Sequence, residues 1–143
     1  MAEEGQQNIQ NLALQHRDLQ KRAQTIQQQT NMLQMSIEDC GKAITTLEDL
    51  QSFSKNPDTL VPIGAGSFVN ANIANDNKVV VEVGAGISVE KDVDGAIVTL
   101  NKRKEDLQKV LEQMNQNLEQ INQRIQSIES IAKQQQQQQH PQQ

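Results

Sequence analysis

A nine-residue pattern occurs twice in the middle of the chain, at residues 61–69 and again at residues 81–89. Each copy places short runs rich in β-branched residues on either side of a Gly-Ala-Gly turn. Because glycine readily adopts the positive φ that a tight reversal needs, each copy predicts a β-hairpin. The region 58–91 is therefore expected to hold two hairpins. The predicted strands are Leu60–Ile63, Ser67–Ile73, Val79–Val83 and Ile87–Glu90.

A long heptad repeat precedes the hairpins. Mostly apolar residues recur at alternating spacings of three and four from Ile9 to Leu47, with polar side chains between them. Such a narrow apolar stripe is typical of a coiled-coil seam. It predicts a helix over residues 5–53, which Pro57 cannot extend. Cys40 lies on this seam, where a thiol packs as a small apolar group.

A second heptad repeat follows the hairpins and runs from Leu100 to Ala132, which predicts a returning helix over residues 92–133. The Gln-rich tail, residues 134–143, is expected to be a fraying helix end followed by disorder. The predicted fold class is α+β, with a long antiparallel two-helix coiled coil and two β-hairpins inserted at the bend. Two long helices around two hairpins leave little room for a catalytic cleft.

The hairpin strands alternate apolar and polar residues, so each hairpin presents an apolar face. Four short strands cannot cover that face and both edges within one chain. We therefore expect other subunits to cover them. The predicted assembly residues are Val61, Ile63, Val69, Val79, Val81, Val83, Ile87 and Val89.

Charge and composition disfavour several classes of function. A net charge of -5 argues against a nucleic-acid partner, which requires a basic surface. Only two aromatic residues are present, so the bulky anchors of a small-molecule pocket are missing. Neither Gly-Ala-Gly segment precedes a helix as a phosphate-binding loop would. We expect no enzyme activity and no cofactor.

Further signals bear on location and metal binding. The single cysteine fits a reducing compartment, and no stretch is long and apolar enough to span a membrane. The N-terminus lacks the features of a signal peptide. His16 and His140 lie far apart without a set of further ligands, so no metal site is expected. These features predict a soluble cytoplasmic protein without a membrane partner.

An antiparallel pairing of the helices would leave apolar side chains uncovered at the end farthest from the strands. If Leu47 faces about Leu100, then His16 lies near Ile131, and Ile9 and Leu12 face glutamines that offer no apolar contact. Such a tip is suited to bind non-native chains, and the alternative is that these residues fray or pack against a neighbouring chain. The predicted tip residues are Ile9, Leu12, Leu14, Ile131 and Ala132.

The order of helix, two Gly-Ala-Gly hairpins and returning helix resembles the prefoldin family over nearly the whole chain. The segments Val-Pro-Ile-Gly-Ala-Gly-Ser-Phe-Val at 61–69, Val-Val-Val-Glu-Val-Gly-Ala-Gly at 79–86 and Val-Glu-Lys-Asp at 89–92 look like the α-type subunit, most like its archaeal version. The β-type subunit carries one hairpin.

The resemblance implies a hexamer in which two α and four β subunits combine their hairpins into an intersubunit double β-barrel. It implies a chaperone whose coiled-coil tips hold unfolded proteins without ATP and deliver them to a group II chaperonin. The predicted tip residues match the family's tip by position and not by a motif. The alternative is a structural coiled-coil module that tethers or oligomerises other proteins and has no chaperone activity.

Overall fold

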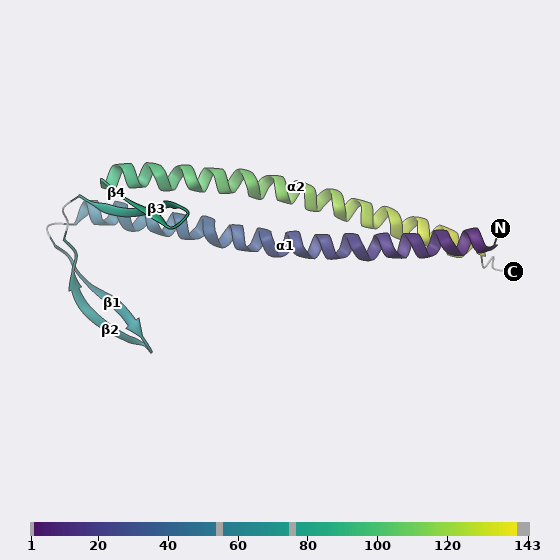
Figure 1. Ribbon diagram of the computed structural model, residues 1–143, viewed down its shortest axis with the longest axis horizontal. Helices are drawn as coiled ribbons and strands as arrows, with labels where there is room; N and C mark the ends of the chain where they lie inside the picture. The colour runs from purple at the N-terminus through teal and green to yellow at the C-terminus, as the bar shows by residue number, and fades with distance from the viewer. Residues whose placement is uncertain (1, 54–55, 75–76, 140–143) are drawn as a thin grey trace. The chain divides into compact units, whose positions relative to one another are not determined.

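The computed structural model of the protein describes residues 2–53, 56–74 and 77–139 (Figure 1). Two long helices enclose two small antiparallel hairpins in sequence order, which confirms the predicted elements and fold class. The chain divides into two compact units, and each is described by itself. The helix-end unit comprises Met1–Met35 with Leu107–Gln143, and the hairpin unit comprises Ser36–Asp106. The elements are α1 (Ala2–Ser52), β1 (Asp58–Gly64), β2 (Ser67–Asn72), β3 (Val79–Gly84), β4 (Ile87–Lys91) and α2 (Val93–Gln139).

The boundaries depart from the sequence-based ranges mainly at the end of α2. This helix continues through the glutamines to Gln139, whereas residues from 134 onward were expected to be a fraying helix end followed by disorder. Glutamine is a good helix former, so the helix continues after the apolar repeat has ended. The rest of the tail, with His140, lies outside the described residues. Ile73 follows β2, and its N–H donates to the Pro57 carbonyl at 3.0 Å, closing the base of the first hairpin.

Both hairpins turn through two residues with positive φ. In the first, Ala65 and Gly66 have φ of 50° and 72°, and in the second Ala85 and Gly86 have φ of 52° and 74°. Positive φ at both central residues is the pattern of a type I′ turn, whose twist matches that of the flanking strands. The prediction assigned positive φ to the glycines, but alanine adopts it as well.

The core of the hairpin unit lies where the second hairpin packs on the helices. Val81 of β3 is only 6% exposed and joins a buried cluster with residues of both helices. Figure 1 shows the β3–β4 hairpin lying alongside the helices. Burying these side chains removes apolar surface from water and holds the hairpin on the helix pair. Val81 was predicted to face other subunits, but it faces the chain's own core. The other buried members are Ile44, Leu47, Val93, Ala96 and Leu100.

Polar contacts join the second hairpin to α2. The Lys91 ammonium donates to Thr99 Oγ1 at 2.8 Å, and the Arg103 guanidinium donates to the Glu82 carbonyl. Both donors are charged, which strengthens these hydrogen bonds. They hold β3 and β4 against the first turns of α2.

Asp92 caps the start of α2. Its carboxylate accepts from the Gly95 N–H at 2.8 Å, and its carbonyl accepts from the Ala96 N–H at 2.9 Å. This is the geometry of a helix N-cap. A Cβ on Gly95 would lie 2.5 Å from Asp92 Oδ1, so a larger residue here would require the capping carboxylate to shift. Asp94, in the first turn of α2, accepts from the Gln51 side chain at 2.8 Å.

The seam of the helix-end unit is mostly half-buried, with two buried side chains. Ile128 is buried, and so is Thr30, whose hydroxyl donates to the Gln27 carbonyl at 2.8 Å and is thereby satisfied. His16 Nε2 donates to the Glu129 carboxylate at 2.9 Å across the pair. A residue early in α1 thus faces one late in α2, so these segments run antiparallel.

Candidate functional sites

A groove lies where α1 begins and α2 ends, and we call it the terminal groove. It encloses about 410 Å³. Ile9 and Leu12 enter it from seam positions of α1, and Ile128 and Ala132 enter it from α2. Its rim is polar and carries charges of both signs. The remaining lining residues are Ala13, His16, Glu129, Lys133 and Gln136.

Three of the five predicted tip residues meet in the terminal groove. Ile9 and Leu12 are half-buried and face Ala132, which was itself predicted for the tip. Leu14 is 63% exposed and Ile131 is 44% exposed, and neither lines the groove. The predicted tip is therefore a partly covered groove with two exposed apolar side chains outside it.

The helix register differs slightly from the predicted one. His16 was expected near Ile131 but faces Glu129, which brings the apolar end of α2 closer to Ile9 and Leu12. Beyond Ala132 the next seam position is Gln135, whose Oε1 is buried without a hydrogen-bond partner among the described residues. A buried amide oxygen without a partner is unfavourable. The glutamines thus form a poor seam here, as expected.

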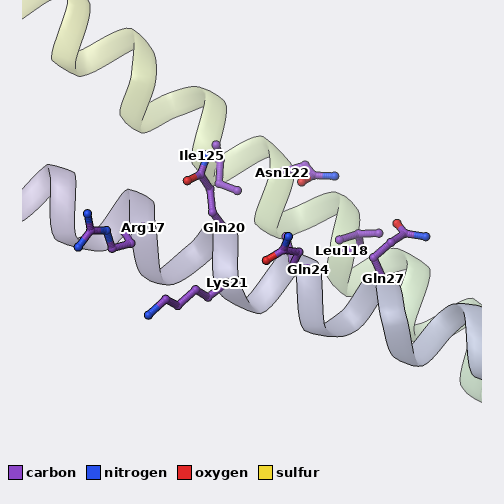
Figure 2. Close-up of a pocket in the computed structure, with 9 residues that line it drawn as sticks. Arg17, Gln20, Lys21, Gln24, Gln27, Leu118, Asn122 and Ile125 are labelled. Atoms are coloured by element: carbon purple, nitrogen blue, oxygen red, sulfur yellow. The ribbon is translucent and has the colours of Figure 1, made fainter.

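Two further grooves flank α1 farther from its start, and these were not predicted. The larger, of about 650 Å³, has a floor of Ala23, Leu118 and Ile125 (Figure 2). The second, of about 500 Å³, has Ile26 and Ile121 in its lining. The residue in the sequence that could have indicated the larger groove is Ala23, because a small residue at a seam position leaves space between the helices. Alanine fits the heptad pattern, so the pattern alone conceals the gap.

Most of the predicted assembly residues lie exposed on the hairpins. Val79 is half-buried and Val81 is buried within the chain, but the other six have uncovered side chains. Phe68 and Leu60 add to the exposed apolar surface of β1 and β2. So much exposed apolar side-chain surface on short strands is typical of a protein interface. The exposed six are Val61, Ile63, Val69, Val83, Ile87 and Val89.

The chemistry available at these sites is that of contact surfaces. Across residues 2–53, 56–74 and 77–139, no group of three or more His, Cys, Asp or Glu side chains is placed to hold a metal ion. Within the same part of the chain, neither helix is long and apolar enough to cross a membrane. Cys40 is buried in the first helix and forms no disulfide.

Comparisons with known proteins agree with this arrangement. A family model described as "Prefoldin subunit" matches residues 19–138. A prefoldin subunit alpha of Methanococcoides burtonii is 53% identical over 130 residues, covering 91% of this chain and 94% of the relative.

Two solved structures share the fold. A chain in the cryo-EM structure of filamentous PFD from Methanocaldococcus jannaschii superposes with a TM-score of 0.71 at 20% identity, covering 82% of this chain and 98% of that chain. The crystal structure of the prefoldin beta subunit from Thermococcus strain KS-1 superposes with a TM-score of 0.57 at 16% identity, covering 87% and 89%.

The matched length and the level of identity assign the chain to the prefoldin family. Prefoldin is a molecular chaperone that delivers its clients to a chaperonin, and its subunits are chaperones rather than enzymes. The family assignment confirms the resemblance inferred from the twin hairpins, and it favours the chaperone over the purely structural module.

Proposed function

We propose that the chain captures segments of unfolded proteins at the terminal groove, with Ile9, Leu12 and Ala132 as its apolar floor and Leu14 and Ile131 as outer contacts. The observation that carries this proposal is the apolar groove at the open end of the helix pair. A flexible client can lay an apolar side chain in the groove and recover about 25 cal/mol for each Å² of apolar surface covered.

Capture at one groove is weak because only a few apolar side chains line it. Several copies acting on one flexible client would bind it more tightly through effective concentration. We infer that this subunit works in an assembly of two α and four single-hairpin β subunits, through the exposed faces of its hairpins. The apolar residues left uncovered on β1 to β4 support this inference.

The client is then delivered to a group II chaperonin as its many weak contacts with the grooves are released. This release requires neither ATP nor a metal and takes place in the cytoplasm. Neither Gly-Ala-Gly turn leads into a helix, so neither offers amide groups at a helix N-terminus to a phosphate. Added ATP should therefore leave the release of client unchanged.

The capture site is tested by Ile9→Ser combined with Leu12→Ser in the complete assembly. We expect suppression of aggregation of a chemically unfolded protein to fall severalfold, because the groove loses its apolar floor. Met32→Ser with Met35→Ser is the matched control, since both methionines are exposed on α1 outside the groove. Light scattering measures the suppression, and native mass spectrometry verifies that assembly mass is unchanged.

Unaltered suppression by the groove variant would refute capture at the terminal groove. Leu14→Ser with Ile131→Ser separates the outer contacts from the floor, and we expect a smaller loss from this pair. For the assembly, native mass spectrometry after mixing with a single-hairpin partner should show two copies of this chain with four of the partner. A monomer that persists beside the partner would contradict that stoichiometry.

A further inference from the structure

The two grooves that flank α1 share an unusual charge pattern. Every charged side chain that lines them is a cation, with Arg17 and Lys21 at the larger groove and Lys21 and Arg22 at the smaller. We call these three residues the cationic band. No carboxylate lines either groove, although the chain as a whole carries a net charge of -5. Positive charge is thus concentrated beside two apolar grooves on an acidic protein.

Among the described residues, two of the three cations have no acidic partner. Arg22 lies 3.4 Å from Asp18 in an exposed pair along the helix, whereas neither Arg17 nor Lys21 forms an ion pair with the described residues. Arg17 and Lys21 are exposed on α1. In Figure 2 the Lys21 side chain points away from α2, whereas the floor residues Leu118 and Ile125 come from α2. Their charges therefore remain available to an external anion at the edge of an apolar floor.

The remaining lining of the larger groove is neutral and able to hydrogen-bond. Gln20, Gln24 and Gln27 of α1 and Asn122 of α2 provide amides above the floor. Such side chains can donate to, and accept from, the backbone of an extended peptide. The groove thus combines an apolar floor, amide side chains that can hydrogen-bond to a peptide backbone, and positive charge.

We propose that the cationic band and its two grooves bind acidic, apolar segments of client proteins, as a second contact beside the terminal groove. This inference rests on the proposed chaperone function. The terminal groove differs in charge, because Glu129 and Lys133 both line it and offset each other. Leu12 and Lys21 are separated by roughly 14 Å of helix at 1.5 Å per residue, which about four extended residues can span. One client segment can therefore reach both sites.

A nucleic acid fits these grooves less well than a peptide does. Single-stranded nucleic acids bind through aromatic stacking along an extended basic track. The chain has two phenylalanines and no other aromatic ring besides histidine, and neither Phe53 nor Phe68 lines a flank groove. Three cations on one helical stretch also form a short track. Charge complementarity and the apolar floor together favour an acidic peptide.

The test uses a fluorescein-labelled peptide that alternates aspartate and leucine, added to the assembly that contains the full chain. Fluorescence anisotropy at low ionic strength should detect binding that weakens as salt is added. Arg17→Glu with Lys21→Glu should weaken binding about tenfold, since two attractive charges become repulsive. Lys102→Glu with Lys109→Glu is the matched control, because it changes the net charge equally at exposed positions outside the grooves. This control should leave the affinity within about twofold of the parent's.

A second variant tests the floor without changing any charge. Ala23→Leu fills the gap between Leu118 and Ile125, which should preserve or raise the melting temperature while weakening peptide binding. Because the helix pair remains intact, a merely structural role for this position would not produce that combination. Equal binding by the Ala23→Leu variant and the parent would overturn the proposal.

Other outcomes would also overturn it. A peptide with lysine in place of aspartate could bind with the same affinity as the acidic peptide. The Arg17→Glu and Lys21→Glu variant could bind the acidic peptide as tightly as the parent does. An equal concentration of oligothymidylate could displace the peptide. Complete loss of peptide binding in the Ile9→Ser and Leu12→Ser variant, with unchanged binding in the Arg17→Glu and Lys21→Glu variant, would place the peptide in the terminal groove instead. Failure of the proposed capture function would be seen in a different experiment. The Ile9→Ser and Leu12→Ser variant would then suppress aggregation as well as the parent does.

Discussion

The two hairpins have nearly the same turn and the same pairing pattern, yet their surroundings differ. Val61 pairs with Val69 in the first hairpin as Val81 pairs with Val89 in the second. Val61 is 41% exposed, whereas Val81 is 6% exposed and belongs to the core. The repeat therefore determines the internal geometry of each hairpin, but it does not determine what the hairpin packs against.

This difference separates two tasks of the hairpins. The β3–β4 hairpin contributes to the folding of the single chain, because it covers the helix pair and is held by Lys91 and Arg103. The β1–β2 hairpin contributes no residue to that core. We propose that β1–β2 depends on neighbouring subunits for cover and is the first element to open in the isolated chain.

The largest expected effect comes from Val81→Asp compared with Val61→Asp. At Val81 a carboxylate would be buried among apolar side chains without a partner, so the free energy of unfolding should fall by about 3–5 kcal/mol. At Val61 the same change is expected to alter the stability of the isolated chain by no more than about 0.5 kcal/mol, because the side chain is solvated. Urea unfolding followed by circular dichroism measures both values.

The effect of Val61→Asp is also tested on assembly with the partner subunits. Val61→Asp should prevent stable association with the partner subunits although the isolated chain remains folded, and native mass spectrometry reads this out. Comparable loss of stability from both substitutions would show that β1–β2 packs on the chain as β3–β4 does, contrary to our interpretation.

Removing the polar contacts of the second hairpin should have an intermediate effect. Arg103→Ala deletes the donor to the Glu82 carbonyl and is expected to cost about 1 kcal/mol. Amide hydrogen exchange should then become faster in β3 and β4 and remain unchanged in β1 and β2. Lys102→Ala serves as the control, since Lys102 is exposed and makes none of these contacts. Faster exchange in both hairpins would contradict a role of Arg103 confined to the second.

The elements of the fold were predictable because their signals are local. The heptad spacing gives the helices, and the twin Gly-Ala-Gly turns give both hairpins within one or two residues of their observed ends. The surroundings of each strand were not predictable. A sequence period of two residues shows which side chains share a face of the strand, but it does not show which surface that face packs against. Val81 was assigned to the subunit interface for this reason.

The site was predictable in part. Ile9, Leu12 and Ala132 were identified from the mismatch between the two seams, and they do line one groove. The pairing of His16 with Glu129 was missed because the register was inferred from one assumed pair near the bend. The flank grooves were missed because a heptad count treats Ala23 as equal to a larger apolar residue, whereas the space between helices depends on side-chain volume.

A smaller effect is expected at the junction between β4 and α2. Asp92→Ala removes the cap on the Gly95 N–H and should cost about 1 kcal/mol, which lowers the melting temperature by about 3 °C in a chain of this size. Asp94→Ala removes an exposed contact with Gln51 and should cost no more than about 0.5 kcal/mol. Differential scanning calorimetry measures the melting temperatures of the two variants. A larger loss of stability from Asp94→Ala than from Asp92→Ala would mean that the helix begins later than Val93.

The smallest effect concerns the alanines with positive φ, and it tests the same difference between the hairpins. A left-handed conformation costs a non-glycine residue about 1–2 kcal/mol, while glycine loses about 0.5–1 kcal/mol more backbone entropy on folding, so Ala85→Gly should stabilise by about 0.5 kcal/mol. Ala65→Gly relieves the same strain in β1–β2, but that hairpin is outside the core, so the melting temperature of the isolated chain should not change. Ala85→Val is the opposing control, because a β-branched residue tolerates this φ poorly and should lower the melting temperature. Equal gains from Ala65→Gly and Ala85→Gly in the isolated chain would mean that both hairpins unfold together with the helices, and the division of tasks between them would have to be abandoned.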